Sequence, residues 1–389
     1  MRPGTRMLAW AAAVALATAA AGCGHESLSQ RVREATVGGT VESLRGTAVT
    51  RGPVAVVLAG GPNERLHVID LVGGRVMRTV KLRSFAQFCA ADEAGRRVVT
   101  AQCGLVADDA DSACGVIAVD GSAGARYIPT RVPNPTEVAV LGSTAYVVHG
   151  FEQREGLCLS AVDLERSIVT REAHVPAGTT AIASAGGRLF VADTMEASGS
   201  VPARLRLSVL DTATLVPRML VAASLAGASV LDDPLSSQSR PTLLLLGARD
   251  ASSAASRRGT AEVWRLDATS GEVLQRKPLE GLVAGAFGGC VTRGAIAVLD
   301  ASDADGSGSD AGGIALYDTR TLEPRGRLEV TAPLAVASWG ERVLVVSGVA
   351  GSRESAQLVV FEDGSLRPAS RVPLPSVEVM ADIAVLDAK

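Results

Sequence analysis

The chain has few of the residues that build catalytic centres. Its 389 residues include only four histidines, which are His25, His67, His149 and His174. The sequence also lacks a nucleophile elbow, a phosphate-binding loop, a dinucleotide fingerprint and a paired-cysteine metal pattern. A zinc or copper site needs two or three such ligands within reach of one ion, so the scattered histidines predict packing or surface roles. No motif in the sequence identifies a reaction.

Basic residues are not in excess either. The chain has 38 Lys and Arg against 41 Asp and Glu, a formal net charge of −3. A nucleic-acid partner is not expected, because it would require a basic stripe that neutralises phosphates. Beyond the N-terminal segment 1–22, no part of the chain sustains the apolar periodicity of an α-helix, which disfavours a helical fold. With 47% hydrophobic residues, the chain can nevertheless bury a large core.

The N-terminal segment 1–22 is typical of an export signal. Arg2 and Arg6 precede the apolar run LAWAAAVALATAAAG at 8–22, and Cys23 follows it. The run is too short and too closely flanked to span a membrane as a mature helix, so residues 1–22 should be removed on export. Removal of the two arginines leaves 36 basic and 41 acidic residues, a formal charge of −5.

The junction Ala20-Ala21-Gly22-Cys23 resembles the lipobox of bacterial lipoproteins, in which small residues precede a cysteine that is lipidated. Ala20 stands where that family usually has Leu. The resemblance implies a lipid on Cys23 that anchors the exported chain to a membrane, facing the periplasm or the cell surface, without a transmembrane helix. Residues 23–50 would then form a polar tether. An ordinary signal peptide followed by an incidental cysteine is the alternative.

A repeat with a period of about 49 residues runs along the rest of the chain. Each copy is an alternating apolar run, an Asp that opens a turn, and a second alternating run, as in ALYDTRTLEPRGRLEV at 315–330. An Asp at this place caps backbone N–H groups two residues further on, so its predicted role is structural. The seven copies have Asp70, Asp120, Asp163, Asp211, Asp267, Asp318 and Asp363.

The surrounding runs predict four strands in each repeat. An apolar run such as VAVVLAG (54–60) precedes each copy, and a further short strand precedes most of these runs. Four-stranded units repeated radially close into a β-propeller. We therefore predict an all-β propeller of seven four-stranded blades over residues 51–389. The first blade lacks an innermost strand, which SVEVMADIAVLD (376–387) can supply by pairing the N- and C-terminal strands; an irregular or eighth blade is the alternative.

Residues from about 50 to 389 resemble bacterial YVTN-type and quinoprotein-like seven-bladed propellers. The copy LDATSGEVLQRKPLE at 266–280 is nearest to the quinoprotein repeat, in which an Asp, a Ser-Gly or Thr-Gly turn and a Trp dock one blade on the next. Here Gln275 or Arg276 stands near the place of that Trp, and no other copy restores it. The resemblance implies the fold, and it does not imply a quinone cofactor.

The connections between the second and third strands of the blades are polar and vary in length. Equivalent connections of a propeller project from the same face, so we predict a binding face there for a protein partner or an envelope ligand. Tolerated loops without a role are the alternative. The charged residues expected to provide orientation and specificity are Glu152, Arg154, Glu155, Arg257 and Arg258.

One of these connections, DASDADGSGSD, contains closely spaced carboxylates. Asp300, Asp303, Asp305 and Asp310 could supply hard oxygen ligands to a calcium ion. The segment lacks the terminal Glu and the strict spacing of an EF-hand loop, and a flexible polar tract without metal is the alternative. We expect no other cofactor.

Two cysteines flank another of these connections. Cys103 ends one predicted strand and Cys114 begins the next, which suits a disulfide across the loop of a hairpin. An oxidising compartment favours such a pair. The sequence does not pair Cys89, Cys158 and Cys290, for which a packing role is sufficient.

These features together favour a non-catalytic, lipid-anchored extracytoplasmic propeller whose loop-bearing face binds a protein or an envelope ligand. An enzyme of the lactonase or quinoprotein-like kind, with chemistry at the central funnel, is the second hypothesis. Metal or quinone bound after native purification would discriminate the two. A periplasmic sensor or inhibitory domain is a third.

Overall fold

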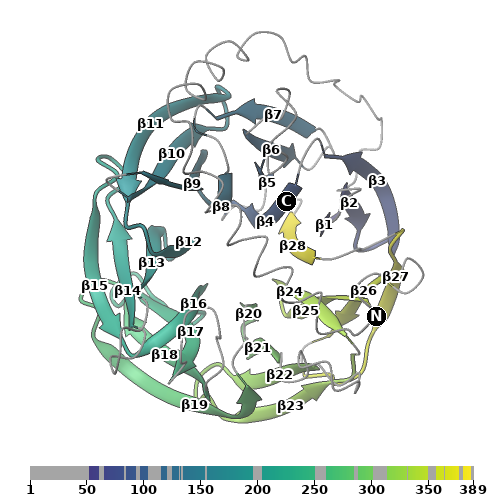
Figure 1. The fold of residues 1–389 in the computed structure, drawn as a ribbon. Helices are drawn as coiled ribbons and strands as arrows, with labels where there is room; N and C mark the ends of the chain where they lie inside the picture. The colour runs from purple at the N-terminus through teal and green to yellow at the C-terminus, as the bar shows by residue number, and fades with distance from the viewer. Residues whose placement is uncertain are drawn as a thin grey trace, which may run out of the picture.

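The chain folds into a ring of antiparallel β-sheets (Figure 1). The computed structural model describes residues 52–60, 65–82, 85–92, 97–103, 115–120, 125–130, 132, 135–153, 156–195, 204–249, 260–283, 288–300, 313–330, 332–348, 356–362, 364–375 and 380–386. Regular structure within these ranges consists of strands, with no helix. Accordingly, the described part of the chain has no helix that is long and apolar enough to cross a bilayer.

The strands form seven sheets of four, each sheet being one blade, which confirms the predicted seven-bladed propeller. From the innermost strand outward, the first three blades are β28 (Met380–Leu386), β1 (Val54–Gly60), β2 (Arg65–Asp70), β3 (Arg75–Lys81); β4 (Phe85–Ala91), β5 (Arg97–Cys103), β6 (Gly115–Asp120), β7 (Ala125–Pro129); and β8 (Pro135–Leu141), β9 (Thr144–Gln153), β10 (Gly156–Asp163), β11 (Ile168–Val175).

The other four blades follow the chain in the same order. They are β12 (Thr179–Ala185), β13 (Arg188–Met195), β14 (Arg204–Leu210), β15 (Pro217–Ala223); β16 (Leu225–Asp232), β17 (Thr242–Arg249), β18 (Thr260–Asp267), β19 (Val273–Val283); β20 (Gly289–Val291), β21 (Ala295–Asp300), β22 (Gly313–Asp318), β23 (Pro324–Leu328); and β24 (Pro333–Trp339), β25 (Arg342–Ser347), β26 (Gln357–Phe361), β27 (Ser370–Pro373).

The ring is closed by the two ends of the folded chain. The last strand, β28, pairs antiparallel with the first, β1, along its whole length, from Val54 opposite Leu386 to Gly60 opposite Met380. Figure 1 shows β28 in yellow beside β1 in purple. The C-terminal strand is thus the innermost strand of blade 1, as predicted, and it covers the edge that β1 would otherwise expose.

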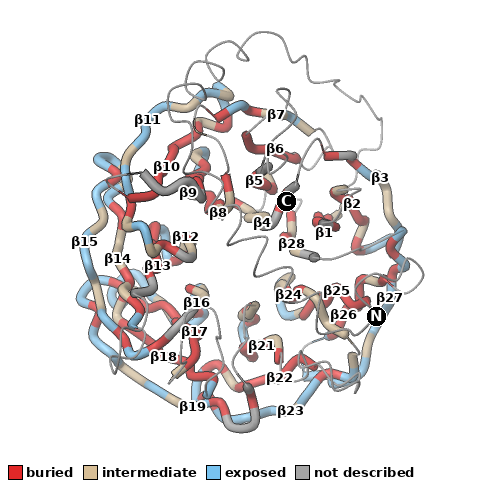
Figure 2. The backbone as a smooth tube through the Cα atoms, in the orientation of Figure 1, coloured by how far each residue is buried: buried red, intermediate tan, exposed pale blue. Residues whose placement is uncertain are grey.

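The apolar core lies between the blades. The buried side chains form seven clusters, and each cluster joins the facing surfaces of two neighbouring blades. The second and third strands of most blades are buried on both faces, and the outer strands are largely exposed (Figure 2). Continuous apolar runs such as TLLLLG in β17 follow from this arrangement, because both faces of a middle strand contact another blade.

The repeated Asp residues hold the turns between the third and fourth strands, as predicted. In each of the five turns that the structure describes around this Asp, one carboxylate oxygen accepts hydrogen bonds from the backbone N–H groups two and three residues further on, at 2.8 to 3.0 Å. The five residues are Asp70, Asp163, Asp211, Asp267 and Asp318. These hydrogen bonds satisfy polar groups at the reversal, so the Asp residues act structurally.

Each of these turns ends in the left-handed conformation four residues after the Asp. Glycine takes this place twice, as Gly74 and Gly271, whereas Ser167, Leu215 and Leu322 adopt φ near +60° without being glycine. Both leucines are almost fully buried. Their burial between the blades offsets the strain that a left-handed backbone imposes on a branched residue.

The eighth residue after the turn Asp faces the turn of the next blade. Arg171 in blade 3 donates a hydrogen bond to the carbonyl of Thr212 at 2.9 Å, and Gln275 in blade 5 donates one to the carbonyl of Thr321 at 3.3 Å. Polar donors on the outer strands thus join neighbouring blades at these two places.

Candidate binding face

The antiparallel order of each blade places all connections between second and third strands at one end of the propeller, which we name the loop-bearing end. The turns between third and fourth strands lie at the opposite, turn-bearing end. Of the predicted binding residues, Arg154, Glu155, Arg257 and Arg258 lie outside the described residues. Glu152 lies in β9, where its backbone is paired with Leu157 of β10. Its side chain is not among the parts of the chain that the structure describes. Their role stays a prediction.

Several blades place a buried polar side chain just below the loop-bearing end. These side chains come from the sixth residue of the second strand in each blade. The second strands of blades 1 to 7 begin at Val54, Arg97, Thr144, Arg188, Thr242, Ala295 and Arg342. At this place the chain has Ala59, Gln102, His149, Asp193, Gly247, Asp300 and Ser347. We name the polar side chains described at this place, His149, Asp193, Asp300 and Ser347, together with Glu262, the polar belt. His149, Asp193, Asp300 and Ser347 are at most 3% exposed.

Glu262 completes the polar belt in blade 5, where the second strand has glycine. It lies on the third strand directly opposite Gly247 and is 1% exposed. The missing side chain of Gly247 leaves room there. Four consecutive blades therefore place an ionisable side chain, His149, Asp193, Glu262 or Asp300, in the same layer.

Each acid of the polar belt is held by an arginine from a strand further out in its blade. Asp193 accepts a hydrogen bond from Nε of Arg206 at 2.7 Å, and Asp300 forms an ion pair with Arg327. The acids are buried, whereas the side chains of Arg206 and Arg327 are 40% and 51% exposed. A buried carboxylate requires such a partner, because an uncompensated charge in the interior is strongly destabilising.

Blade 5 differs because two arginines surround one acid. Arg276 binds Glu262 through two hydrogen bonds, from Nε at 2.7 Å and from an Nη at 3.1 Å. Nη1 of Arg249 lies 4.0 Å from the same carboxylate, and the guanidinium of Arg276 lies over the ring of Trp264, 4.9 Å from its centre. We name Arg249, Glu262, Trp264 and Arg276 the blade-5 arginine cluster.

The buried histidines are packing residues. His149 hydrogen-bonds through Nε2 to Oγ of Ser160 at 2.9 Å, and His67 through Nδ1 to Oγ1 of Thr79 at 3.0 Å. Both are fully buried, whereas His174 is exposed on β11. His67 lies in blade 1 and His174 in blade 3, in different blades as predicted from the sequence, and His149 also lies in blade 3. Among the residues that the structure describes, no three His, Cys, Asp or Glu side chains lie close enough to hold one metal ion.

Asp300 of the predicted calcium set is the end of β21 and part of the polar belt, where Arg327 pairs with it. Asp303, Asp305 and Asp310 lie outside the described residues. Calcium binding by this connection therefore stays a prediction. The contact with Arg327 gives Asp300 a structural partner within its own blade.

A carboxylate and a thiol meet between the innermost strands of blades 1 and 2. Oδ2 of Asp382 in β28 accepts a hydrogen bond from the backbone N–H of Cys89 in β4 at 2.7 Å, and Oδ1 accepts one from the N–H of Ile383 at 2.9 Å. Desolvation raises the pKa of Asp382 to about 6, against the lowering effect of these hydrogen bonds. Burial, then the nearby charge of Asp382, raises the pKa of the Cys89 thiol.

The other described cysteines are also free thiols. Cys158 and Cys290 are buried, and desolvation raises the pKa of Cys158 to about 11 and raises that of Cys290 further. Such thiols are poor nucleophiles at neutral pH, which fits packing roles. Cys114 and the side chain of Cys103 lie outside the described residues, so their disulfide stays a prediction.

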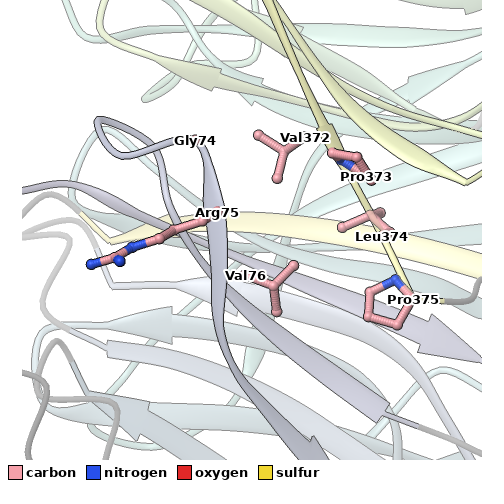
Figure 3. Close-up of a pocket in the computed structure, with 7 residues that line it drawn as sticks. All are labelled: Gly74, Arg75, Val76, Val372, Pro373, Leu374 and Pro375. Carbon is pink, nitrogen blue, oxygen red and sulfur yellow. The ribbon is translucent and has the colours of Figure 1, made fainter.

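A groove lies on the outer surface between blades 7 and 1. It has a volume of ≈ 430 Å³ and is lined by Gly74, Arg75, Val76, Val372, Pro373, Leu374 and Pro375. In Figure 3 the apolar side chains of Val76 and Val372 face the groove, whereas Arg75 points away from it. The groove therefore offers apolar contact and no set of converging polar groups.

Neither the polar belt nor the contact of Asp382 with Cys89 was predicted from the sequence. A signal for the belt was present, because YVVHG, FVADT, AVLD and LVVSG each place a polar residue at the end of an apolar strand. The Asp382 contact joins residues 293 positions apart, and no local pattern indicates it.

Neither the family models nor the curated proteins include a match to this chain. Solved structures do resemble it. The Pseudomonas aeruginosa periplasmic gluconolactonase PpgL has a TM-score of 0.55 at 16% identity, over 86% of this chain and 100% of that one. Apo AztD from Citrobacter koseri has a TM-score of 0.55 at 13% identity, over 87% and 99%.

A third similar structure is the β-propeller domain of the trilobed protease from Pyrococcus furiosus, with a TM-score of 0.55 at 12% identity, over 81% of this chain and 91% of that one. Its ring is described as having an open velcro topology, whereas here β28 closes blade 1. At these identities the comparisons establish the fold, and they place the chain among seven-bladed β-propellers.

Proposed function

We propose that the protein is an exported, non-catalytic propeller, anchored by lipid on Cys23, that binds a protein partner or an envelope ligand through its loop-bearing end. The export signal at 1–22 supports an extracytoplasmic site of action. PpgL, a protein of the same fold, is periplasmic, which agrees with this proposal. The lipid would hold the propeller at a membrane through the tether at 23–50.

The difference between the two ends of the propeller carries the proposal. At the turn-bearing end, the Asp carboxylates bind backbone N–H groups of their own turns, and polar side chains of the outer strands bind the turn of the next blade. These polar groups stabilise the fold. At the loop-bearing end, the strands finish in buried acids whose arginine partners remain 40 to 51% exposed. The polar connections that join the strands here, such as the one at 301–312, differ in sequence from blade to blade. The loop-bearing end thus combines partly exposed arginines with connections whose sequences vary between blades.

Binding would depend on rigid presentation. The closed ring and its interblade cores fix both ends of each connection, which lowers the conformational entropy lost when the connections contact a partner. Such a surface gains affinity from a few converging contacts, so the proposal requires no catalytic group.

The test is partner capture from intact cells. Cells producing the native chain, a Cys23→Ala variant, or a variant with residues 301–312 replaced by Gly and Ser are cross-linked, and the solubilised envelopes are analysed by mass spectrometry. A Val72→Ser variant is the control, because Val72 is 74% exposed on the turn-bearing end. We expect a near-stoichiometric partner that is retained in the control, reduced by Cys23→Ala and lost with the replaced loop.

Equal capture by the control and the loop variant would contradict a role for the loop-bearing end. A monomer without partners that carries a metal or a chromophore would instead favour an enzyme with its site at the central funnel. Detection of a diacylated Cys23 in the native chain by mass spectrometry tests the anchor separately.

A further inference from the structure

We propose that the turn-bearing end of the propeller lies against the membrane that holds the lipid on Cys23, so that the loop-bearing end points away from that membrane. The inference rests on the proposed function, from which it takes the lipid anchor. It adds a second contact with the bilayer, made by apolar side chains of the folded domain, and it gives the direction in which the binding face is presented.

The first step is the place where the chain enters and leaves the fold. Val54, the first residue of β1, is paired with Asp70 at the start of the blade-1 turn and with Leu386 at the end of β28. The carbonyl of Pro53 accepts a hydrogen bond from the backbone N–H of Leu71 in that turn at 3.2 Å. Both ends of the described chain therefore lie at the turn-bearing end, and the predicted anchor is connected to the propeller on this side.

The second step is the distribution of exposed apolar side chains. The described part of the chain has seven large hydrophobic residues that are 38 to 74% exposed. Because neighbouring strands of a blade are antiparallel, the connections between first and second strands lie at the turn-bearing end, as do the turns between third and fourth strands. Each of the seven residues lies in one of these connections or within the first three residues of the outer strand that follows a turn. They are Val72, Ile168, Val216, Met219, Leu235, Val273 and Leu366.

The third step is the arrangement of these side chains around the ring. They come from blades 1, 3, 4, 5 and 7, which surround the propeller axis in Figure 1. A protein partner is bound mainly by a few side chains that converge on one well-packed patch. A bilayer is a flat apolar phase that the protruding side chains of one end reach together, and the transfer of each into it is favourable. Separate apolar side chains confined to one end therefore fit a membrane better than a protein surface.

The fourth step is the charge that accompanies these side chains. Four arginines with ion-pair partners have side chains that are 77 to 87% exposed, and all four lie at the turn-bearing end. Long arginine stems extend along apolar surface while the guanidinium stays among polar head groups. Each guanidinium has an acidic group at 3.8 to 4.0 Å, so docking should depend little on anionic lipid. The four are Arg75, Arg166, Arg293 and Arg367.

The chain has its own fluorescent reporter at this end. Removal of residues 1–22 takes away Trp10 and leaves two of the three tryptophans. Trp339 is the last residue of β24, directly before a connection at the turn-bearing end, and it is partly exposed. Trp264 is 6% exposed and belongs to the core between blades 4 and 5. Bromine atoms on lipid acyl chains quench tryptophan only at short range, so they distinguish a docked end from a free one.

The experiment recruits the mature chain to phosphatidylcholine vesicles with or without brominated acyl chains. A histidine tag in place of Cys23 binds nickel-chelating lipid, so the result does not depend on native lipidation. The informative variant combines Val216→Asp with Met219→Asp, whose side chains are 59% and 63% exposed. The matched control combines Ala222→Asp with Ser224→Asp, because both residues are exposed near the loop-bearing end of the same blade. Circular dichroism checks that all proteins are folded.

We expect brominated lipid to lower the tryptophan fluorescence of the recruited chain. Trp339→Phe should abolish this decrease, because Trp264 is in the core. The decrease should be retained in the control and mostly lost in the variant with Val216→Asp and Met219→Asp, since carboxylates oppose transfer into an apolar phase. It should be similar with anionic vesicles and at low and high salt.

No quenching of Trp339, or equal quenching in the two double variants, would overturn the proposal. Quenching that required anionic lipid would overturn the apolar contact in favour of electrostatic adsorption. A protein cross-linked in cells to the turn-bearing end, without quenching by lipid, would assign this end to a protein partner instead.

The two proposals fail separately. A native Cys23 without lipid, together with intact quenching of the tagged chain, would contradict only the anchor in the proposed function. Val72→Ser stays a control for partner capture, because it changes one of the seven apolar side chains and none at the loop-bearing end.

Discussion

Asp382 in the last strand accepts a hydrogen bond from the backbone N–H of Cys89 in the innermost strand of the next blade, at 2.7 Å. This contact joins the C-terminal strand, which closes blade 1, to blade 2. The strand is therefore fixed on both sides, by β1 within its own sheet and by β4 across the gap. The stability of the strand that closes the ring should therefore depend on whether the Asp382 carboxyl group is protonated.

The stability contributed by Asp382 should fall as the pH rises. Its pKa is raised from 3.8 to about 6 in the folded protein, so the folded state binds the proton more tightly than the unfolded chain. The favourable contribution is complete below about pH 4 and is lost as the pH passes 6, a change of about 3 kcal/mol. Asp382→Asn removes this dependence, and the variant should gain stability relative to the native protein between pH 4.5 and 7.5.

Urea unfolding of both proteins across that range measures the difference. Asp318→Asn is the control, because the backbone N–H of Thr321 is the main group that lowers the pKa of Asp318. Its stability difference from the native protein should change only below about pH 4. A flat difference for Asp382→Asn would contradict the assigned role.

The fold was predictable because its signals are local. Each turn Asp bonds to N–H groups two and three residues away, so Asp318 and its equivalents leave a mark in every repeat. The C-terminal segment SVEVMADIAVLD could be assigned to blade 1 because the repeats supply only three strands for that blade. The sites were less predictable, because Glu262, Arg249 and Arg276 come from three strands, and only pairing opposite Gly247 brings them together.

The close approach of blades 4 and 5 at Gly271 should be measurable by adding one methyl group. Gly271 has φ +77°, and a Cβ there would lie 2.3 Å from the carbonyl oxygen of Leu220. Gly187 has a similar φ of +70° but no atom within 4 Å of such a Cβ. Gly187→Ala should lower the free energy of unfolding by about 1 kcal/mol, because alanine is strained in the left-handed conformation. Gly271→Ala should lower it by roughly 1–3 kcal/mol more, because blades 4 and 5 must also move apart.

Thermal and urea unfolding followed by circular dichroism compare the two glycine variants. Equal losses of stability would show that the turn of blade 5 accommodates the methyl group without moving blade 4.

Thiol labelling should separate the six cysteines into classes. In the exported form that we propose, the protein should contain a disulfide between Cys103 and Cys114, because an oxidising compartment favours it. Cys158 and Cys290 should resist alkylation until the protein unfolds, since burial raises the pKa of both thiols. Peptide mapping without reductant gives the pairing, and recovery of Cys103 as an alkylated thiol from the native protein would remove the disulfide.

Removing one partner of the buried ion pair between Asp233 and Arg265 should destabilise the protein more than breaking an exposed pair. Nε of Arg265 lies 2.7 Å from the Asp233 carboxylate, and the two side chains are 0% and 9% exposed, the acid being the more buried. Asp233 also accepts a hydrogen bond from Thr242 at 2.7 Å, and Arg265 donates to the carbonyl of Thr319 in the next blade. Arg265→Leu leaves the buried Asp233 carboxylate without its cation and should lower the free energy of unfolding by about 3–5 kcal/mol.

Two further variants test that explanation. Adding Asp233→Asn to Arg265→Leu should restore part of the stability, because it removes the buried charge and keeps an acceptor for Thr242. Arg293→Leu breaks an exposed pair with Glu341, whose side chains are 87% and 59% exposed, and should cost less than about 1 kcal/mol. If the double variant were less stable than Arg265→Leu alone, packing of the Arg265 side chain between blades 5 and 6, and not charge compensation, would account for the loss.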